Sequence, residues 1–274
     1  MGSSAEVAIA AKKNPRQALA AALSKLTQPL PITRAARRVV IKPSILDPEI
    51  PGNTSLEVIR AVVGLFENTA EVLIVESDNP YRTVEDAYAK LGYNELATEK
   101  VKLLNLSLDA LEPKSMPGFH LASHEMPHAL RNPLFLVNVA TLKFQPGEGV
   151  VWGGIKNLFG LLPEVEKGDF HPHLEDVLLD LLSAFRPNLT IIDLSEVVIG
   201  KRLTGRRMKV GGVVAGVDPV AVDSYCAGLF GLDPMKVSYL RRACDRGLGE
   251  ALLDRIEVRG TEHQKHILSE RMVL

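Results

Sequence analysis

A lysine and an asparagine stand near the head of the apolar stretch GGIKNLFGLLP, residues 153–163. The connection before it, QPGEGVVWGG, is rich in glycine and follows an apolar run that ends at Lys143. Glycine-rich connections that lead into a helix present backbone N–H groups to an anion, and lysines add positive charge. We therefore predict a phosphate or carboxylate site in this stretch. Its ligand-binding residues would be Lys143, Gly153, Gly154, Lys156 and Asn157.

A purely structural interpretation of the same stretch stays open. Lys156 would then extend its ammonium group to solvent, and Asn157 would cap a kink in the helix. The glycines form neither a Walker loop nor the Rossmann pattern GxGxxG, because Gly147, Gly149 and Gly153 have one residue too many in the second gap. A dinucleotide is thus not indicated, and an unclassified phosphate or carboxylate site fits better.

Two histidines, His171 and His173, follow in the segment DFHPHLEDVLLDLL, residues 169–182. A histidine at a helix entrance acts as an acid or base near neutral pH, or binds a metal through a neutral ring nitrogen. The alternative is that both histidines are ordinary capping residues on either side of Pro172. We select His171 as the catalytic candidate because it precedes the expected helix.

Charged residues follow several of the apolar runs. In an open parallel sheet, ligands bind outside the carboxyl ends of the strands, so polar residues just past strand ends are the first candidates. Lys42 follows VVI and Glu76 follows VLIV, while Asp223 lies in a helical pattern that Asp218-Pro219 opens. Strand-end carboxylates hold a divalent cation or accept a proton. We select Lys42 as a further ligand-binding residue, and Glu76 and Asp223 as catalytic candidates, without assigning a metal.

Short runs rich in β-branched residues alternate with segments of helical periodicity. This order predicts an α/β fold with a mainly parallel sheet flanked by helices. The expected strands span residues 6–11, 38–43, 71–77, 101–106, 134–143, 189–194 and 211–217. The expected helices span residues 15–27, 55–68, 83–91, 150–162, 172–185, 219–230 and 234–246.

A polar residue before a proline marks four of these helix starts. The four pairs are Asn14-Pro15, His171-Pro172, Asp218-Pro219 and Asp233-Pro234. The prolines within residues 107–133 predict an irregular excursion from the sheet, in which the histidines would be solvated loop residues. We expect one α/β domain over residues 5–260, followed by a C-terminal tail at residues 261–274.

Composition narrows the possible partners and cofactors. The chain of 274 residues has 32 lysines and arginines against 33 aspartates and glutamates, so no overall field attracts nucleic acid or an anionic membrane. No run approaches the roughly 18 apolar residues of a membrane span, and no basic leader precedes an apolar core, so we expect a cytoplasmic protein. Cys226 and Cys244 supply too few thiolates for an iron–sulfur cluster, and we expect none in the isolated chain.

Five ordered blocks carry a resemblance to a known family. They begin VVIKPSILDPEIPGN, VLIVESDNPYRTVED, FLVNVATLKFQPGEG, LTIIDLSEVV and GGVVAGVDPVAVDSY. In this order they resemble the family called domain of unknown function 362, over roughly residues 5–260. The resemblance implies the α/β fold better than a function, because the biochemical role of the family is generally unestablished. Members often accompany, or are fused to, ferredoxin-type modules with two four-iron clusters, and many occur in anaerobic microbes.

The chain departs from this family in two respects. It resembles the core domain alone, without the cysteine module. The usual KxKTH block appears here as TLKFQ, in which Lys143 matches the second lysine while Phe144 and Gln145 replace the threonine and the histidine. This departure puts in doubt any chemistry that depends on the family histidine. More distantly, the arrangement is similar to that of nickel-pincer lactate racemases, in which lysine and histidine side chains handle a cofactor and a hydroxy acid.

Two classes of function follow from these observations. The first is an enzyme of anaerobic or redox-linked metabolism that holds an anionic small molecule with Lys42, Lys143 and Lys156. His171 or a carboxylate would then move protons. The second is a non-catalytic module that delivers a cofactor or works with a separate ferredoxin-type partner. Binding of phosphates, hydroxy acids or a divalent ion would favour the first class, and copurification with a ferredoxin would favour the second.

Overall fold

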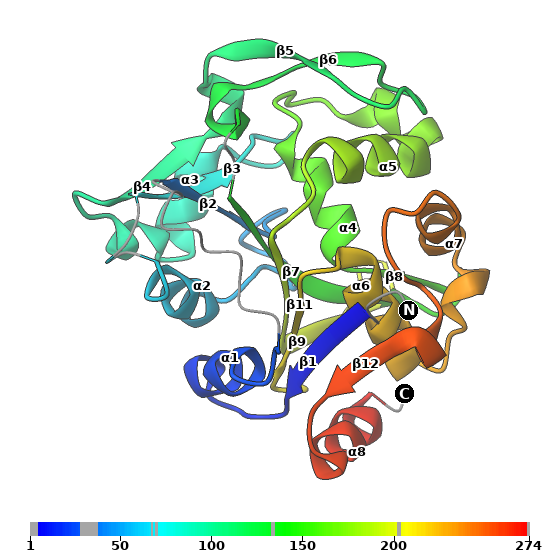
Figure 1. The fold of residues 1–274 in the computed structure, drawn as a ribbon. Coiled ribbons are helices and arrows are strands. Elements are labelled where there is room, and N and C mark those ends of the chain that lie inside the picture. Colours follow the sequence, from blue (N-terminus) through cyan, green and yellow to red (C-terminus); the bar gives the residue numbers. More distant parts are fainter. Residues whose placement is uncertain are drawn as a thin grey trace.

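The computed structural model describes residues 5–27, 38–66, 68, 71–132, 135–201 and 204–272. The strands form one large mixed sheet and a separate two-stranded sheet (Figure 1). In chain order they are β1 (Ala5–Ala10), β2 (Arg38–Pro43), β3 (Glu71–Glu76), β4 (Val101–Asn105), β5 (Leu111–Ser115), β6 (Ser123–Pro127), β7 (Leu136–Gln145), β8 (Val150–Trp152), β9 (Leu189–Ile199), β10 (Arg206–Met208), β11 (Val213–Gly216) and β12 (Ile256–Arg259).

Helices connect and cover these strands. The α-helices are α1 (Pro15–Leu23), α2 (Leu56–Val63), α3 (Val84–Lys90), α4 (Gly154–Asn157), α5 (Leu174–Ala184), α6 (Pro219–Leu229), α7 (Ser238–Asp245) and α8 (Glu262–Arg271). Short 3-10 helices are η1 (Tyr93–Leu96), η2 (Leu106–Leu108), η3 (His128–Leu130), η4 (Leu158–Leu161), η5 (Gly168–His173), η6 (Pro234–Lys236) and η7 (Leu253–Arg255).

The main sheet has the strand order β12-β1-β11-β9-β7-β2-β3-β4, with β8 and β10 paired to β7 and β9. β4, β3, β2, β7 and β9 are parallel, so their carboxyl ends meet at one edge. β11 is antiparallel to both β9 and β1, whereas β12 is parallel to β1. The prediction of a mainly parallel sheet flanked by helices is confirmed.

Two hydrophobic layers cover the sheet, because successive side chains of a strand point to opposite sides. In β7, Leu136, Ala140 and Leu142 join the core beneath α4, α5, α6 and α7. Val137 and Val139, on the opposite side of the same strand, join the core beneath α1, α2 and α3. Figure 1 shows these two groups of helices on opposite sides of the sheet. We call the two sides the α4–α7 face and the α1–α3 face.

Three of the four predicted helix starts are confirmed. The side chains of Asn14, Asp218 and Asp233 accept backbone hydrogen bonds at the starts of α1, α6 and η6. The start predicted at His171-Pro172 is wrong. This proline lies inside η5, and α5 begins after it without a side-chain cap, because the preceding turn is already helical.

The stretch expected as one helix over residues 150–162 consists of three short elements instead. Residues 150–152 form β8, and α4 and η4 follow. The chain turns back after β7, and β8 pairs antiparallel with the end of that strand, with Phe144 opposite Val151. A short apolar run has the same sequence pattern in a buried strand and in a buried helix, which explains the error.

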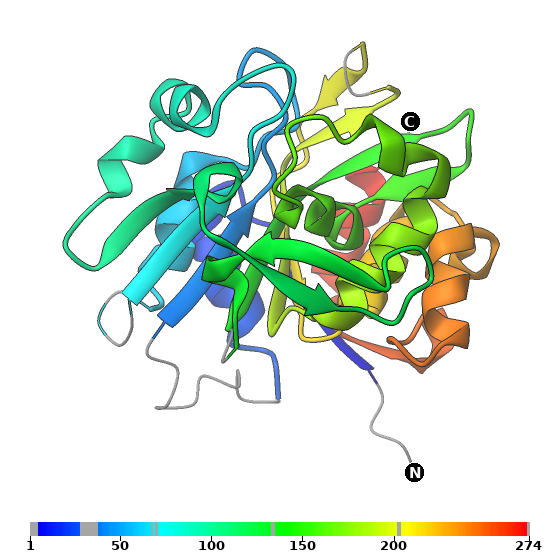
Figure 2. The same ribbon diagram turned by 90° about the horizontal axis from the view of Figure 1, so that it is seen from above.

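The stretch predicted as an excursion at residues 107–133 leaves the main sheet in its described part, residues 107–132, but is more regular than expected. β5 and β6 form an antiparallel hairpin, which Figures 1 and 2 show over α5. Asp180 of α5 accepts hydrogen bonds of 2.7–3.0 Å from four consecutive backbone N–H groups of the hairpin, those of residues 118–121. The ring of His120, expected in solvent, stacks on His173 with centroids 4.3 Å apart. The hairpin is thus tied to both α5 and η5.

Residues 261–274, expected as a tail, form helix α8 in their described part. Thr261 and Gln264 make a capping box at its start. Leu268 is fully buried, and Lys25 donates a hydrogen bond to Gln264. α8 therefore packs against the body of the fold, next to β1.

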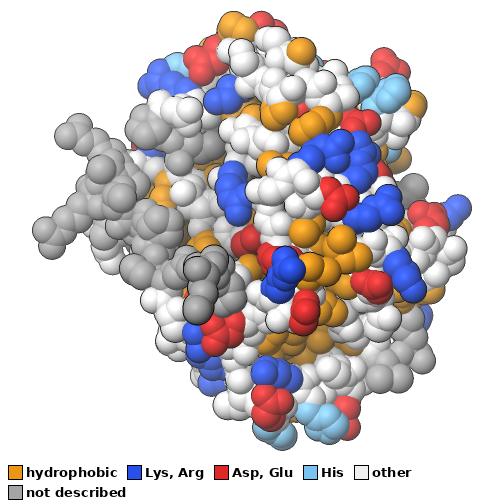
Figure 3. All heavy atoms as spheres, turned by 45° about the vertical axis from the view of Figure 1, so that its right-hand side comes forward, with side chains coloured by type: hydrophobic (Ala, Val, Ile, Leu, Met, Phe, Trp, Pro, Cys, Tyr) orange, Lys and Arg blue, Asp and Glu red, His pale blue; other side chains and the backbone are white. Residues whose placement is uncertain are grey.

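Charges of both signs are mixed on the surface. Figure 3 shows lysine and arginine side chains interspersed with aspartate and glutamate on the face turned forward. This agrees with the formal net charge of −1. A charged ligand must therefore be held by local groups rather than by an overall field.

In the ranges that the structure describes, no helix combines the length and the apolar character needed to cross a membrane.

Candidate functional site

A buried ion pair lies at the carboxyl edge of the parallel strands. Lys42, near the end of β2, shares the α4–α7 face with Val40. Its Nζ donates to Glu76 Oε2 at 2.7 Å and to the Pro43 carbonyl at 2.8 Å. Only 1% of the Lys42 side chain and 3% of the Glu76 side chain are exposed. Because two charges this deep are costly, they need further polar partners, and Ser77 N donates to Glu76 Oε1 at 3.0 Å.

Gly160, in η4, closes over this ion pair. A Cβ atom at this position would lie 2.7 Å from Lys42 Nζ and 2.9 Å from Glu76 Oε1. Ser77 Oγ donates to the Gly160 carbonyl at 3.1 Å, which ties the loop after β3 to η4. The close approach of backbone to charged side chains thus explains why glycine occurs here. The sequence patterns did not single out Gly160.

A second lysine, Lys167, lies beside the pair and was also missed from the sequence. Its Nζ donates to the carbonyl of Asp78 at 3.0 Å and to the carbonyl of Glu164. Burial lowers the pKa of Lys167 to about 8, the carboxylates of Glu76 and Glu164 oppose this shift, and the positive charges of Lys42 and Arg82 add to it. The surrounding sequence, EVEKGDF, contains no motif that would have identified this lysine.

Arg82 fixes the two loops beside the ion pair. Its guanidinium donates to the carbonyls of Ile45 and Leu46 in the loop after β2, at 2.9 and 3.2 Å. It also donates to the carbonyl of Ser77 in the loop after β3, at 2.6 Å. Carbonyl oxygens are neutral acceptors, so these bonds satisfy the donors without cancelling the positive charge.

Lys156, Phe159 and His171 lie together next to Gly160. Lys156 Nζ is 3.7 Å from the centroid of the Phe159 ring. The His171 ring meets the same ring edge to face, with centroids 5.4 Å apart, and its Nδ1 is 3.1 Å from the carbonyl of Lys167. His171 therefore contacts the backbone of the newly identified lysine, and Lys156 is linked to His171 through the Phe159 ring. We call the following group the lysine site: Lys42, Glu76, Lys156, Lys167 and His171.

The cations of this region differ in their hydrogen-bond acceptors. Lys42 donates to the carboxylate of Glu76, whereas Lys167 and Arg82 donate to backbone carbonyl oxygens. A neutral acceptor satisfies a donor without cancelling its charge. Water screens such partly buried charges only weakly.

Asn157, predicted to bind the ligand, bridges two strands. Its Nδ2 donates to the Lys42 carbonyl at 3.1 Å and to Asn138 Oδ1 at 2.8 Å. Asn138 Nδ2 in turn donates to the Gly154 carbonyl at 2.8 Å. These bonds fix α4 on β2 and β7, and Asn157 is only 9% exposed. The amide of Asn157 and the carbonyl of Gly154 therefore bind groups of the protein.

The glycine-rich start of α4, expected to bind an external anion, holds the carboxylate of Asp223. Gly154 N and Ile155 N donate to its two oxygens at 2.7 and 2.9 Å. A Cβ atom at Gly153 would lie 2.5 Å from Asp223 Oδ1. The glycines thus make room for a side chain of α6, which corrects the expected position of the ligand. Burial raises the pKa of Asp223 to about 7 in spite of the two hydrogen bonds.

Lys143 does not lie with Lys156, because the two side chains are on opposite faces of the sheet. In the alternation of β7, Lys143 shares the α1–α3 face with Val139 and Thr141. Its Nζ donates to Thr141 Oγ1 at 2.7 Å, and this hydroxyl donates to the Gly52 carbonyl in the loop before α2. The expected shared pocket is therefore corrected: Lys143 lies in β7 and Lys156 in α4 after β8, and the direction of the strand side chain separates the two lysines.

Asp193, in β9, has structural partners. Asp193 accepts hydrogen bonds from Ser55 N at 3.0 Å and from Ser195 N at 2.8 Å. Cys226 and Cys244 are free thiols. Among the residues described, no group of three or more histidine, cysteine, aspartate or glutamate side chains is arranged to hold a metal ion. The geometry therefore assigns no metal to the catalytic candidates.

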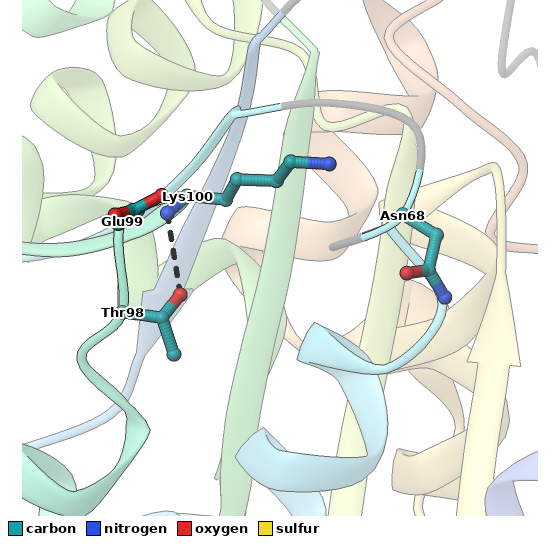
Figure 4. Close-up of a pocket in the computed structure, with 4 residues that line it drawn as sticks. All are labelled: Asn68, Thr98, Glu99 and Lys100. Carbon is teal, nitrogen blue, oxygen red and sulfur yellow. Dashed lines mark hydrogen bonds between the residues drawn. The ribbon is translucent and has the colours of Figure 1, made fainter.

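A cavity of about 380 Å³ lies away from the lysine site (Figure 4). Its lining residues are Asn68, Thr98, Glu99 and Lys100. These residues precede β3 and β4, so the cavity is at the amino ends of these strands. In sheets of this kind ligands bind at the carboxyl ends, and the lysine site remains the better candidate.

Comparison with known proteins identifies a family but no characterised relative. A search among curated proteins gave no significant match. The family model described as domain of unknown function (DUF362) matches residues 39–228, which include the whole lysine site. The matched segment is more than half of the chain, and the protein therefore belongs to the DUF362 family.

Proposed function

We propose that the protein is an enzyme that binds an anionic small molecule, a carboxylate or a phosphate, at the lysine site. The observation that supports this proposal is that Lys167 and Arg82 donate to neutral carbonyl oxygens in largely buried surroundings, so these bonds do not cancel their positive charge. The position agrees with it, because open parallel sheets bind their ligands at the carboxyl edge.

The residues of the lysine site have different roles in this proposal. Lys156 and Lys167 contact the anion, because both are partly exposed whereas Lys42 is buried. Lys42 and Glu76 stay paired beneath them and maintain the charge of the site. His171 is exposed next to Phe159 and supplies an acid or a base near neutral pH.

The proposal places this activity in anaerobic or redox-linked metabolism, as the family resemblance suggests. It also places the protein in the cytoplasm, where Cys226 and Cys244 would remain thiols. Work with a separate ferredoxin-type partner is the competing explanation, and the experiment below distinguishes the two.

Isothermal titration calorimetry with phosphate, lactate and pyruvate tests anion binding. Wild-type protein should bind at least one of them. Lys167→Met should weaken that binding roughly ten- to a hundredfold, because a charge-assisted hydrogen bond contributes about 1.5–3 kcal/mol. Lys143→Met is the matched control, since it removes a partly buried lysine from the opposite face and should leave the affinity unchanged.

Two results would overturn the proposal. One is that none of the three anions binds to the folded wild-type protein. The other is that Lys143→Met and Lys167→Met lose affinity equally. Copurification with a ferredoxin-type protein, together with no anion binding, would support the competing role.

A further inference from the structure

Lys167 differs from the other lysines of the site in how its amino group is held. Nζ donates to the carbonyl of Asp78, after β3, and to the carbonyl of Glu164, after η4. A neutral amine has two N–H bonds and one lone pair in a tetrahedral arrangement. Two backbone acceptors in separate segments therefore use both N–H bonds and fix the direction of the lone pair.

The neighbouring lysines have other contacts. Lys42 Nζ is bound to Glu76 and to a backbone carbonyl in the buried pair. Lys156 Nζ lies over the ring of Phe159, a contact that favours a charged ammonium. Of these three lysines, Lys167 combines partial exposure with burial that lowers the pKa of its amine.

Electrostatics supports the same distinction. Burial lowers the pKa of Lys167 to about 8 although the carboxylates of Glu76 and Glu164 oppose the shift, and the cations of Lys42 and Arg82 add to it. At neutral pH the neutral fraction of this amine is then on the order of 100-fold larger than that of an ordinary lysine. Desolvation and adjacent cations are the means by which enzymes make a lysine nucleophilic.

We infer that Lys167 is a carbonyl-reactive amine and that the anion of the lysine site carries a ketone or an aldehyde, as in a 2-oxo acid. The lone pair of Nζ attacks the carbonyl carbon, and a carbinolamine forms. The carbonyl oxygen then leaves as water with the two hydrogens of the amine, and a C=N bond joins the substrate to Lys167. Lys156 holds the carboxylate of the substrate. This inference rests on the proposed function and names its substrate class.

Reductive trapping tests the inference on the intact wild-type chain. Pyruvate and sodium borohydride are added together, because borohydride converts a C=N bond to a stable secondary amine, and peptide mapping by mass spectrometry locates the label. We expect the label on Lys167, and we expect the trapping rate to rise through about pH 8, as the pKa of this amine requires. Lactate, which has no carbonyl at the reacting carbon, should give no label.

Two variants provide the controls. Lys167→Arg keeps the positive charge and should reduce the trapped fraction roughly tenfold or more, because guanidinium groups stay protonated. Lys100→Arg removes an exposed lysine from the cavity at the other edge of the sheet and should trap like wild type (Figure 4). If Lys167→Arg fails to fold, the peptide map and the pH profile of wild type still decide.

The possible outcomes test the carbonyl chemistry and the anion binding separately. Label spread over exposed lysines such as Lys100, or no label while lactate and pyruvate bind in calorimetry, overturns the carbonyl chemistry and leaves anion binding intact. Failure of both anions and of phosphate to bind overturns the proposed function itself. Specific label on Lys167 supports both.

Discussion

Asp223 and Glu76 are two buried carboxylates beneath the same segment, α4 with η4, and they differ in what surrounds them. Gly153 approaches the first and Gly160 the second so closely that a Cβ atom would collide with a carboxylate oxygen. Asp223 accepts two backbone N–H groups of α4. Glu76 is bound to the ammonium group of Lys42, next to Lys167. The first carboxylate is held by neutral donors and the second by a cation.

This difference distinguishes a structural use of charge from a use in ligand binding. The N–H groups at the start of α4 already have an acceptor from α6, so they have no need of an external anion. Lys167, beside this ion pair, donates to neutral carbonyl oxygens, so under the proposed function its charge attracts an external anion. A glycine-rich helix start thus indicates an anion site. It does not indicate whether the anion is an external ligand or a carboxylate of the protein itself.

Replacement of Lys42 should have the largest effect on stability. Lys42→Met leaves Glu76 buried without its partner and should lower the free energy of unfolding by roughly 3–5 kcal/mol. The double variant Lys42→Met/Glu76→Leu leaves neither charge and should regain much of this loss. Urea unfolding measures both values. Equal instability of the single and double variants would contradict a pairing role for Lys42.

Asp223 should make the free energy of unfolding depend on pH. The pKa of an ordinary aspartate carboxyl is 3.8, whereas that of Asp223 is about 7 in the folded chain, so the folded chain binds more protons between these two pH values. The stability that this group contributes is complete below about pH 4 and is lost as the pH rises through about 7, by roughly 4 kcal/mol.

Urea unfolding of wild type and Asp223→Asn over this pH range measures the effect. The variant has no ionisable group at this position, so the part of the pH dependence that Asp223 causes should disappear. Only the slopes are compared, because the asparagine amide also loses one of the two N–H contacts with α4. Equal slopes would show that Asp223 ionises as readily in the folded chain as in the unfolded chain.

Gly160→Ala should have an intermediate effect. The new Cβ atom would lie 2.7 Å from Lys42 Nζ, so the ion pair or η4 must shift, at a cost of roughly 1–3 kcal/mol. Gly147→Ala is the matched control, because a Cβ atom there meets nothing within 4 Å. Thermal unfolding should show a lower midpoint for the first variant and little change for the second. Equal midpoints would mean that η4 moves away from Lys42 at little cost in free energy.

Local patterns predicted the strands well and the partners of their side chains poorly. β2 and β3 were found because β-branched runs specify buried parallel strands, and Lys42 and Glu76 were found because they end these runs. Position 143 was placed at the right edge but on the wrong face, since the alternation along β7 was not counted.

Contacts between distant parts of the chain explain what the sequence could not reveal. Asp223 reaches Gly154 across 69 residues, and no local pattern shows which carboxylate fills the start of α4. Lys167 belongs to the site only because the segments after β3 and η4 converge on its amino group. Its charge was visible in the sequence, but its burial was not.

Lys156→Ala should have the smallest effect on stability. It decides whether the charge of Lys156 is structural, like that of Asp223, or binds the ligand. Lys156 is partly exposed, and its contact with the Phe159 ring contributes about 0.5–1 kcal/mol, so urea unfolding should show a loss below about 1 kcal/mol. Lys156→Arg should retain this contribution, because a guanidinium also stacks on an aromatic ring. If Lys156 contacts the anion, calorimetry should show roughly tenfold weaker binding for the alanine variant, a larger change than its effect on stability suggests. Unchanged affinity together with reduced stability would instead show that Lys156, like Asp223, has a structural role. Anion binding would then depend on Lys167.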